Sequence, residues 1–362
     1  ILKTPEFFKG TAFMVRDGEL VKVDIPEDAE VHGIFKEQML VNLRTDWTVG
    51  GNTYPADALL AIGYEDFMAG GRDFQTLFTP EARISLGGVA TTRDHLLVST
   101  MDNVRSKLYK HSFADGSWSH EAVELPGLGS AGVNGTSDLN NDFFFTYTDF
   151  TKPSSLYFVA DGQDAVKVKS TPEFFDTEGM KVDQYEAKSA DGTMIPYFIF
   201  TPKGYEADGK NPTMLYGYGG FEVSMRPRYS AATGTGWVAR GGVYVLANIR
   251  GGGEFGPEWH KAAVQEKHQT NFDDFIAVAE DLIARNVTSP EHLGIVGGSQ
   301  GGLLVGGTFV QRPELFEAVV CQVPLLDMKR YNKLLAGASW MAEYGNPDTD
   351  DWEYMQKWSP YQ

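Results

Sequence analysis

The sequence predicts two domains, an antiparallel all-β domain over residues 1–177 and an α/β domain with a mostly parallel sheet over residues 178–362. Three observations lead to this division. In the first half, β-rich segments recur about every ten residues, several of them separated by Asp-Gly. In the second half, apolar strand-like runs alternate with helical spacing. One of those runs ends in a glycine-rich turn around a single serine.

The first 177 residues show no convincing helical pattern. Their predicted strands are Thr11–Val15, Glu19–Ile25, Gln38–Leu43, Leu96–Thr100, Lys107–Phe113, Asp142–Tyr147 and Ser155–Val159. Asp-Gly pairs indicate tight hairpin turns, because both residue types tolerate positive φ. Loose similarities at spacings of about 45 to 55 residues favour four-stranded propeller blades. The spacing alone leaves a β-sandwich open as the alternative.

The pattern changes near Gly179, and the domain boundary is expected between residues 172 and 182. The predicted strands of the second half are Val182–Ala187, Met194–Phe200, Thr213–Tyr216, Gly242–Ile249, Leu293–Val296 and Glu317–Val323. The last is expected to be buried. Asn271–Arg285 has the spacing of a helix with one apolar face and its acidic residues opposite. Strands that alternate with helices predict an α/β architecture.

Composition excludes several classes of partner. The formal net charge is −18, which argues against nucleic acid or an anionic membrane surface. No apolar run is long enough to span a bilayer. The one cysteine, Cys321, excludes an internal disulfide, and we expect it to be a buried strand residue. We expect neither a metal nor a cofactor. Arg250–Glu254 is interpreted as a site-shaping loop. A phosphate-binding role is disfavoured, because no Lys-Ser/Thr of a phosphate-binding loop follows this segment.

The segment Gly297-Gly298-Ser299-Gln300-Gly301 matches the G-x-S-x-G nucleophile elbow. A strand-like run precedes it and a helix-like run follows it, which is the context that this motif requires. Ser299 would then lie at a strained backbone angle, and the glycines would allow neighbouring backbone to approach without a Cβ clash. The alternative is an ordinary glycine-rich β–α turn.

An elbow serine needs a histidine base and an orienting aspartate, in the chain order Ser, Asp, His. All seven histidines precede Ser299: they are His32, His95, His111, His120, His260, His268 and His292. The aspartates after it are Asp327, Asp348, Asp350 and Asp351, of which the last three are expected to be solvated. We therefore expect the chain to be a fragment. The rival hypothesis, with His260 or His292 as base, requires an unusual chain order.

Three motifs in order resemble the prolyl oligopeptidase family. They are Leu215–Phe221 (LYGYGGF), Asn248–Gly256 (NIRGGGEFG) and Gly297–Leu304 (GGSQGGLL). The resemblance is continuous from about residue 178 and looser before it. It implies an incomplete α/β-hydrolase fold, doubly wound with a mostly parallel sheet, after part of a seven-bladed-type β-propeller. It also implies a cytosolic-type serine peptidase that cleaves short peptides after proline.

The resemblance carries roles to particular residues. It implies that Ser299 is the nucleophile and that the Gln300 N–H and the Tyr218 hydroxyl form the oxyanion hole. A phenol suits that place because it donates a hydrogen bond while remaining neutral at pH 7. The implied proline pocket consists of Phe221, Leu325, Trp340 and Tyr344. A helix would put Trp340 and Tyr344 on one face, although without the resemblance this pair would be interpreted as core packing.

The sequence also departs from the family pattern. Gln300 stands where most members have Asn, which affects local packing but keeps the backbone donor. Glu343–Pro347 is partly reminiscent of oligopeptidase B, so a peptidase that cleaves after basic residues is one alternative. A non-catalytic peptide-binding protein is a second alternative, and a lipase or esterase on this fold is a third. The family's triad aspartate and histidine would lie beyond residue 362. We expect short peptides as substrates, a monomer when full length, and a cytoplasmic location, with the periplasm as an alternative.

Overall fold

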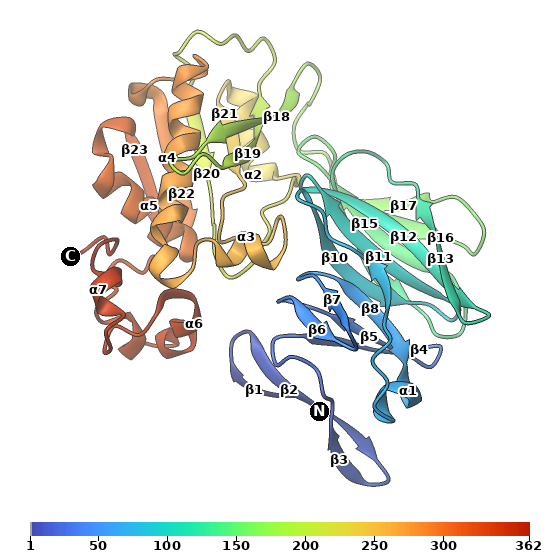
Figure 1. The fold of residues 1–362 in the computed structure, drawn as a ribbon. Helices are drawn as coiled ribbons and strands as arrows, with labels where there is room; N and C mark the ends of the chain where they lie inside the picture. Colours follow the sequence, from blue (N-terminus) through green and yellow to red (C-terminus); the bar gives the residue numbers. More distant parts are fainter. Residues whose placement is uncertain (1) are drawn as a thin grey trace. The chain divides into compact units, whose positions relative to one another are not determined.

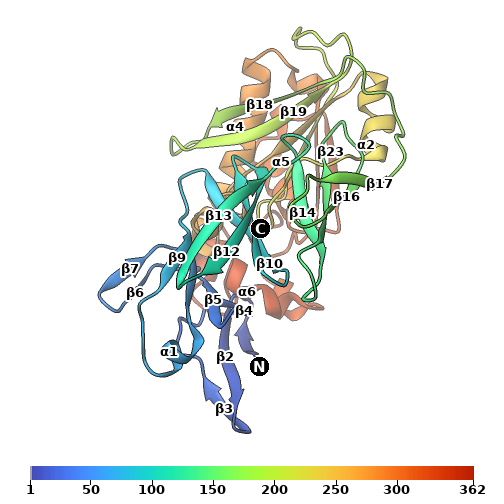
Figure 2. The same ribbon diagram turned by 90° about the vertical axis from the view of Figure 1, so that its right-hand side faces the viewer.

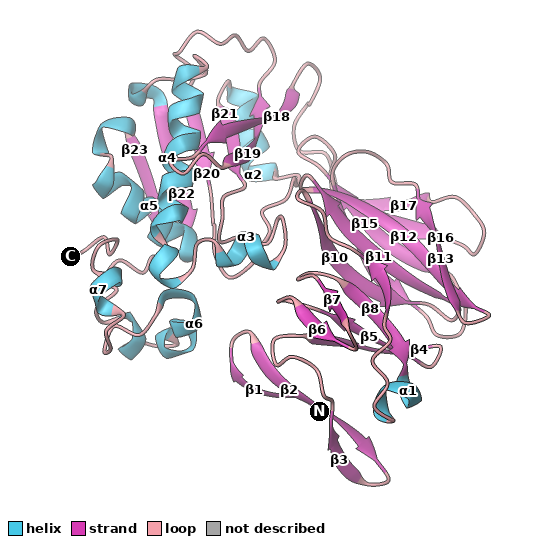
Figure 3. Cartoon of the chain, in the orientation of Figure 1, coloured by secondary structure: helices cyan, strands magenta, loops and turns pink. Residues whose placement is uncertain are grey.

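The computed structural model describes residues 2–362, which form two compact units (Figures 1 and 3). Unit 1 contains the residues up to Tyr147, together with Ser154–Ser170 and Phe255–Pro257. Unit 2 contains Thr148–Pro153, Thr171–Glu254 and Glu258–Gln362. The boundary predicted after residue 177 therefore falls inside unit 2. Within residues 2–362, no helix combines the length and the apolar character needed to cross a bilayer.

Unit 1 is built from antiparallel hairpins that form three four-stranded sheets (Figure 2). The first sheet contains β4 (Glu30–Phe35), β5 (Gln38–Asn42), β8 (Leu59–Gly63) and β9 (Gln75–Phe78). The second contains β10 (Ile84–Thr91), β11 (His95–Asp102), β12 (Arg105–Ala114) and β13 (Ser117–Val123). The third contains β14 (Ser130–Thr136), β15 (Phe143–Thr148), β16 (Ser155–Val159) and β17 (Val166–Ser170).

Two smaller sheets complete unit 1. They are formed by β1 (Leu2–Glu6), β2 (Lys9–Arg16) and β3 (Glu19–Lys22), and by β6 (Trp47–Val49) and β7 (Asn52–Tyr54). The Asp-Gly turns lie where the sequence predicts them. Asp115 and Gly116 have φ of 49° and 77°, and they join Ala114 to its partner Ser117. Positive φ at both central residues matches the right-handed twist of the strands, so these pairs determine the hairpin registers.

The burial pattern of the first sheet favours stacked blades over a sandwich. Along β5, Met39 and Val41 belong to one buried cluster, which also contains Phe74. Leu40, between them, belongs to a different cluster together with Leu96 of the second sheet. Successive strand residues point to opposite faces, so this sheet is buried on both sides. A sheet of a two-layer sandwich would leave one face to solvent.

The first 177 residues show no convincing helical pattern, yet they contain the short helix α1 (Tyr64–Met68). Phe67 is the one buried residue of this five-residue helix, and acidic Glu65 and Asp66 occupy its first turn. Carboxylates are favourable near a helix N-terminus. A helix this short has too few residues to produce a 3.6-residue apolar repeat, so no periodicity could predict it.

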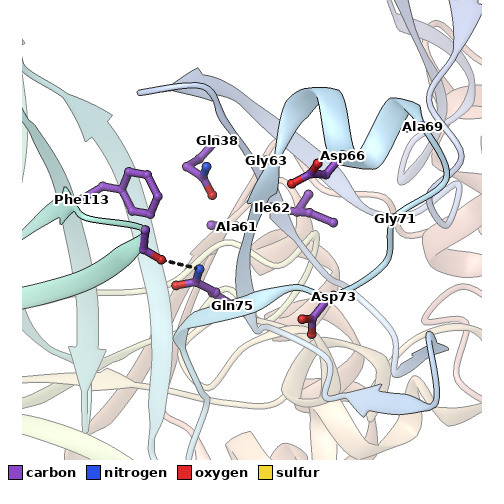
Figure 4. Close-up of a pocket in the computed structure, with 11 residues that line it drawn as sticks. Gln38, Ala61, Ile62, Gly63, Asp66, Ala69, Gly71, Asp73, Gln75 and Phe113 are labelled. Carbon is purple, nitrogen blue, oxygen red and sulfur yellow. Dashed lines mark hydrogen bonds between the residues drawn. The ribbon is translucent and has the colours of Figure 1, made fainter.

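Unit 1 also contains a groove of about 610 Å³ beside α1 (Figure 4). It is lined by Gln38, Ala61, Ile62, Gly63, Asp66, Ala69, Gly71, Asp73, Gln75, Phe113 and Gly116. Gln75 Nε2 donates to the Gly116 carbonyl at 3.1 Å and so joins the first and second sheets. None of the predicted catalytic or substrate-binding residues lines this groove.

Unit 2 contains a six-stranded mixed sheet in the order β18-β19-β21-β20-β22-β23 (Figure 1). Its strands are β18 (Lys181–Lys188), β19 (Met194–Thr201), β20 (Thr213–Tyr216), β21 (Val243–Ala247), β22 (Leu293–Gly298) and β23 (Ala318–Gln322). The β18–β19 and β19–β21 pairs are antiparallel, and the other three pairs are parallel. The predicted strands of this half are confirmed, as is the mostly parallel α/β sheet.

Helices and short 3₁₀ turns connect these strands. The helices are α2 (Ala231–Gly236), α3 (Pro257–Lys261), α4 (Gln269–Ala284), α5 (Gln300–Gln311), α6 (Met341–Tyr344) and α7 (Trp352–Met355). The 3₁₀ turns are η1 (Val238–Arg240), η2 (Gln265–Lys267), η3 (Pro290–His292), η4 (Pro313–Leu315), η5 (Tyr331–Lys333) and η6 (Gly337–Trp340). Helix α4 packs on β18 and β19, α5 packs on β22 and β23, and the two helices contact each other.

The prediction of a buried strand over Glu317–Val323 is correct for the strand but wrong for its burial. Val319 and Val320 of β23 are 37% and 46% exposed. Within residues 2–362, β23 pairs only with β22, so its other edge is open. Cys321 is half-buried rather than buried, and its thiol donates to the Gly302 carbonyl of α5 at 3.2 Å. Local apolarity predicts a strand, but only neighbouring elements bury it.

Candidate active site

Ser299 lies on the sharp turn between β22 and α5, with φ of 58° and ψ of −117°. A non-glycine residue rarely adopts this conformation, and the strain that the motif predicts at Ser299 is therefore present. The Ser299 N–H donates to the Gln322 carbonyl of β23 at 3.0 Å, and its carbonyl accepts from Gly302 and Leu303 of α5. These bonds hold the backbone of the turn. Ser299 is exposed and lies at the carboxyl end of strand β22.

The glycines around Ser299 permit very close backbone contacts. A Cβ on Gly297 would lie 2.1 Å from the Gly301 carbonyl oxygen, and a Cβ on Gly301 would lie 2.7 Å from that of Gly217. Neither contact is sterically possible, because the obstacle is backbone rather than a flexible side chain. The predicted role of these glycines is confirmed, and the Gly217 contact also places the Tyr218 segment beside the elbow.

Tyr218 follows β20 and makes a side-chain hydrogen bond with Ser299. Burial raises the pKa of the Tyr218 hydroxyl above its ordinary value of 10, and the charge of Glu343 contributes in the same direction, while the bond to Ser299 opposes both. The phenol is therefore neutral at pH 7 and able to donate a hydrogen bond. The second predicted donor, the Gln300 N–H, belongs to the first residue of α5, where amide groups have no intrahelical acceptor.

The Gln300 side chain is fully buried and bonded at both ends of its amide. Its Oε1 accepts from the Tyr344 hydroxyl at 2.6 Å. Its Nε2 donates to the Gly219 carbonyl and to Asn271 Oδ1, at 3.3 Å each. The substitution of glutamine for the family's usual asparagine is thus accommodated without an unpaired amide. It links Tyr344 to the loop that carries Tyr218.

That loop contains two successive non-glycine residues with left-handed backbone, Phe221 at φ 54° and Glu222 at φ 58°. Each such residue costs of order 1 kcal/mol, so other contacts must hold the loop. Glu222 N–H donates to the Gly251 carbonyl at 3.2 Å. Asn271 Nδ2 donates to the Gly219 carbonyl at 2.7 Å and to that of Arg250 at 2.9 Å. The Arg250 loop therefore contacts the Tyr218 loop, as a site-shaping segment would.

Arg250 is buried between two carboxylates. Its Nε and Nη2 donate to the two oxygens of Asp274 at 2.9 and 2.6 Å, and its guanidinium also donates to Asp191. Asp274 is 0% exposed, and Ser189 Oγ donates to it at 2.6 Å. The prediction that the acids of this helix face away from the core is therefore wrong for Asp274. Its charge is matched by Arg250, a residue that helical spacing cannot reveal.

Three of the four predicted pocket residues pack against the main hydrophobic cluster of unit 2, and the fourth, Tyr344, belongs to that cluster. Phe221, Leu325 and Trp340 are partly buried, whereas Tyr344 is fully buried. The rings of Phe221 and Tyr344 meet edge to face, with centroids 5.7 Å apart and planes at 88°. Trp340 ends η6 and Tyr344 ends α6, so a 3₁₀ turn and an α-helical turn replace the single helix that was predicted.

The structure gives no support to a base among the histidines considered for Ser299. His292 belongs to η3, at the start of β22, and Ser299 follows the end of that strand. Six strand residues separate them by about 20 Å. His260 Nε2 donates to Glu343 Oε2 at 2.8 Å, so this nitrogen has its own carboxylate partner. Sequence reasoning missed Glu343, whose only signal was an acidic residue beside a predicted pocket tyrosine.

Two buried groups of unit 2 give opposite pH dependences of stability. Burial lowers the pKa of His268 from 6.5 to about 4. The contribution of the neutral imidazole to the free energy of unfolding is therefore complete above pH 6.5 and is lost as pH falls towards 4. Burial raises the pKa of Glu254 from 4.5 to about 7, so its contribution is complete below pH 4.5 and is lost as pH rises towards 7. Each effect amounts to about 3 kcal/mol.

Between pH 4.5 and 6.5 the two effects have opposite slopes. We therefore expect their combined contribution to the free energy of unfolding to change little over this range. Glu254→Gln should leave the His268 effect alone and make stability rise with pH. His268→Gln should do the reverse. Urea unfolding of the three proteins at half-unit pH steps measures the slopes. Parallel slopes for both variants would contradict the assignment, whatever the overall loss of stability in either.

Comparison with known proteins agrees with this geometry. The sequence profile described as "Prolyl oligopeptidase family" matches residues 228–362, and the one described as "Prolyl oligopeptidase, N-terminal beta-propeller domain" matches residues 48–170. The chain belongs to the prolyl oligopeptidase family of serine peptidases. As the resemblance implied, unit 1 is part of a β-propeller and unit 2 is part of an α/β-hydrolase domain.

Similar family members include an uncharacterized peptidase of Sinorhizobium fredii, 42% identical over 95% of this chain and 48% of that protein. A prolyl endopeptidase of Elizabethkingia miricola is 39% identical over 66% of this chain and 34% of that protein. A solved structure of a post-proline cleaving enzyme from Rickettsia typhi superposes with a TM-score of 0.94 at 39% identity, covering 99% of this chain and 53% of that one. The chain spans about half the length of the curated relatives that it matches.

Proposed function

We propose that the protein containing this chain is a serine oligopeptidase that hydrolyses short peptides on the C-terminal side of proline. The observation that carries the proposal is the strained Ser299 elbow with the neutral Tyr218 hydroxyl hydrogen-bonded to it. A nucleophile and a preorganised hydrogen-bond donor are the two parts that acyl transfer requires of this half of the protein. The prolyl endopeptidase and post-proline cleaving enzyme among its relatives support the same choice of substrate.

In the proposed reaction, Ser299 Oγ attacks the carbonyl carbon of the proline residue while a histidine outside this chain takes its proton. The carbonyl π electrons move to oxygen, and the resulting oxyanion accepts hydrogen bonds from the Gln300 N–H and the Tyr218 hydroxyl. When the carbonyl re-forms, the C–N bond breaks and the amine leaves with the proton from the histidine. Water then attacks the acyl-enzyme by the same route and releases the peptide acid.

The proposed proline pocket uses the partly buried side chains of Phe221, Leu325 and Trp340, and the buried ring of Tyr344 packs against Phe221. A flat, apolar, aromatic surface complements a pyrrolidine ring, which has no N–H to satisfy after acylation of its nitrogen. The alternative preference for basic residues would need an accessible carboxylate. Glu343 is 1% exposed and both of its oxygens are bonded, so it does not offer a counter-charge to substrate.

The proposal is tested on the full-length protein with two chromogenic peptides that differ only in proline or arginine before the reporter group. We expect kcat/KM to be at least about 100-fold higher for the proline peptide, since a mismatched charge in an apolar pocket costs several kcal/mol. Faster cleavage after arginine would support the basic-residue alternative instead. Failure of Ser299 to react with a fluorophosphonate would support the non-catalytic, peptide-binding alternative.

Replacement of Tyr218 by phenylalanine is expected to lower kcat by about 10²- to 10³-fold with little change in KM, because an oxyanion-hole donor acts in the transition state. Tyr216→Phe is the matched control, since Tyr216 ends β20 only two residues earlier and has no role in the proposed reaction. Steady-state kinetics on the proline peptide give both constants. Equal kcat for the two variants would rule out the role of Tyr218.

A further inference from the structure

Glu343 makes a buried bridge between two segments that are far apart in the sequence. Its Oε1 accepts the Phe221 N–H at 2.8 Å, and its Oε2 accepts a hydrogen bond from His260 Nε2 at 2.8 Å. Glu343 is 1% exposed and His260 is 3% exposed. A carboxylate in such a place is unfavourable unless each oxygen is bonded, so the arrangement is stable only with both partners present.

The bridge lies at the point where the Tyr218 loop is most strained. The bonded amide belongs to Phe221, the first of the two residues with left-handed backbone. A Cβ on the preceding residue, Gly220, would lie 3.2 Å from Glu343 Oε1 and 2.5 Å from the Gln300 side chain. The loop therefore contacts Glu343 directly through its backbone.

Both ends of this loop segment carry groups of the proposed reaction. Tyr218, three residues before Phe221, is hydrogen-bonded to Ser299. The Phe221 ring packs against Tyr344, the residue next to Glu343. A shift of the Phe221 backbone would therefore move the oxyanion donor and one wall of the pocket together. Misplacement by about 1 Å is enough to lose most of the effect of such groups.

We propose that Glu343, held in place by His260, is a positioning residue that fixes the Tyr218–Phe221 loop for catalysis. The expected effect on kcat rests on the proposed function, whereas the expected effect on the order of the loop does not. Glu343 touches neither substrate nor the reacting atoms. It acts through the Phe221 amide, and His260 acts through Glu343 by fixing the orientation of the carboxylate.

The kinetic test is a double-mutant cycle in the full-length protein. Glu343→Ala should lower kcat by about 10- to 100-fold, below the loss expected for Tyr218→Phe. The double variant should have no lower kcat than Tyr218→Phe alone, because the oxyanion donor that Glu343 positions is already missing; a displaced Phe221 wall would then appear in KM. Glu343→Gln keeps an acceptor oxygen for the Phe221 N–H and should recover most of the activity. The inference would be overturned if the loss of kcat in the double variant equalled the product of the two single losses. It would also be overturned if Glu343→Gln were as slow as Glu343→Ala.

A second readout needs no turnover. Hydrogen exchange of the amides of residues 217–223 should become at least about tenfold faster in Glu343→Ala and in His260→Ala, and should return towards the parent rate in Glu343→Gln. Glu258→Ala, on the same short helix as His260 but with a side chain that is 73% exposed, should leave it unchanged. Unchanged exchange in Glu343→Ala would overturn the inference even if the peptidase proposal holds. If the parent protein has no peptidase activity but the two alanine variants still exchange faster than it, the positioning role of Glu343 holds and the peptidase proposal is refuted.

Discussion

Replacing Ser299 with alanine is expected to lower kcat for a proline-linked peptide by roughly 10⁴- to 10⁶-fold, the range seen when a serine peptidase loses its nucleophile. The reason is that acylation has no other acceptor, so only the binding and oxyanion groups remain to assist water. The variant should still bind substrate, since Tyr218, Gln300 and the pocket residues are unchanged. Single-turnover kinetics of the full-length protein measure the loss directly.

The matched control is Ser289→Ala, which changes the N-cap residue of η3, the turn that precedes β22. This variant should keep the parent kcat within about twofold, because it lies about 20 Å from the elbow. Circular dichroism of both variants should match the parent. Undiminished cleavage by Ser299→Ala, in a preparation free of other peptidases, would exclude Ser299 as the nucleophile.

Replacing Arg250 with methionine is expected to reduce the free energy of unfolding by about 3–5 kcal/mol. Methionine keeps an unbranched apolar stem but lacks the guanidinium, so the main change is the loss of the charge and of the hydrogen bonds that face Asp274. Asp274 is 0% exposed and would be left without a cation, and its pKa is already raised by burial even with Arg250 present. Denaturant unfolding at neutral pH measures this loss.

The double variant Arg250→Met/Asp274→Asn is expected to recover a large part of the loss, because no uncompensated buried charge remains. Arg330→Met is the control for an exposed pair, since the Arg330 side chain that bonds Asp327 is 70% exposed. Its cost should be below about 1 kcal/mol. Equal costs for Arg250→Met and Arg330→Met would show that the buried network does not hold the loop.

The amino-acid sequence by itself determined the elements and the motif around which they are arranged. Alternation, Asp-Gly turns and apolar runs predicted most strands correctly, because these features depend on local backbone preference and on which face a residue presents. The elbow was predictable for the same reason. The glycines around Ser299 are needed by backbone geometry within a few residues of the serine, so the local sequence contains the whole requirement.

Only the tertiary structure decided which distant groups meet. Glu343 binds the amide of Phe221, 122 residues away, and Asp274 pairs with Arg250 across two different segments. A local pattern says whether a position faces the core, but a buried charge is tolerated only where a specific partner is brought to it. The exposed face of β23 follows the same rule, since burial depends on what packs beside a strand. Local chemistry therefore predicted the nucleophile, and long-range packing determined the residues that hold its surroundings in place.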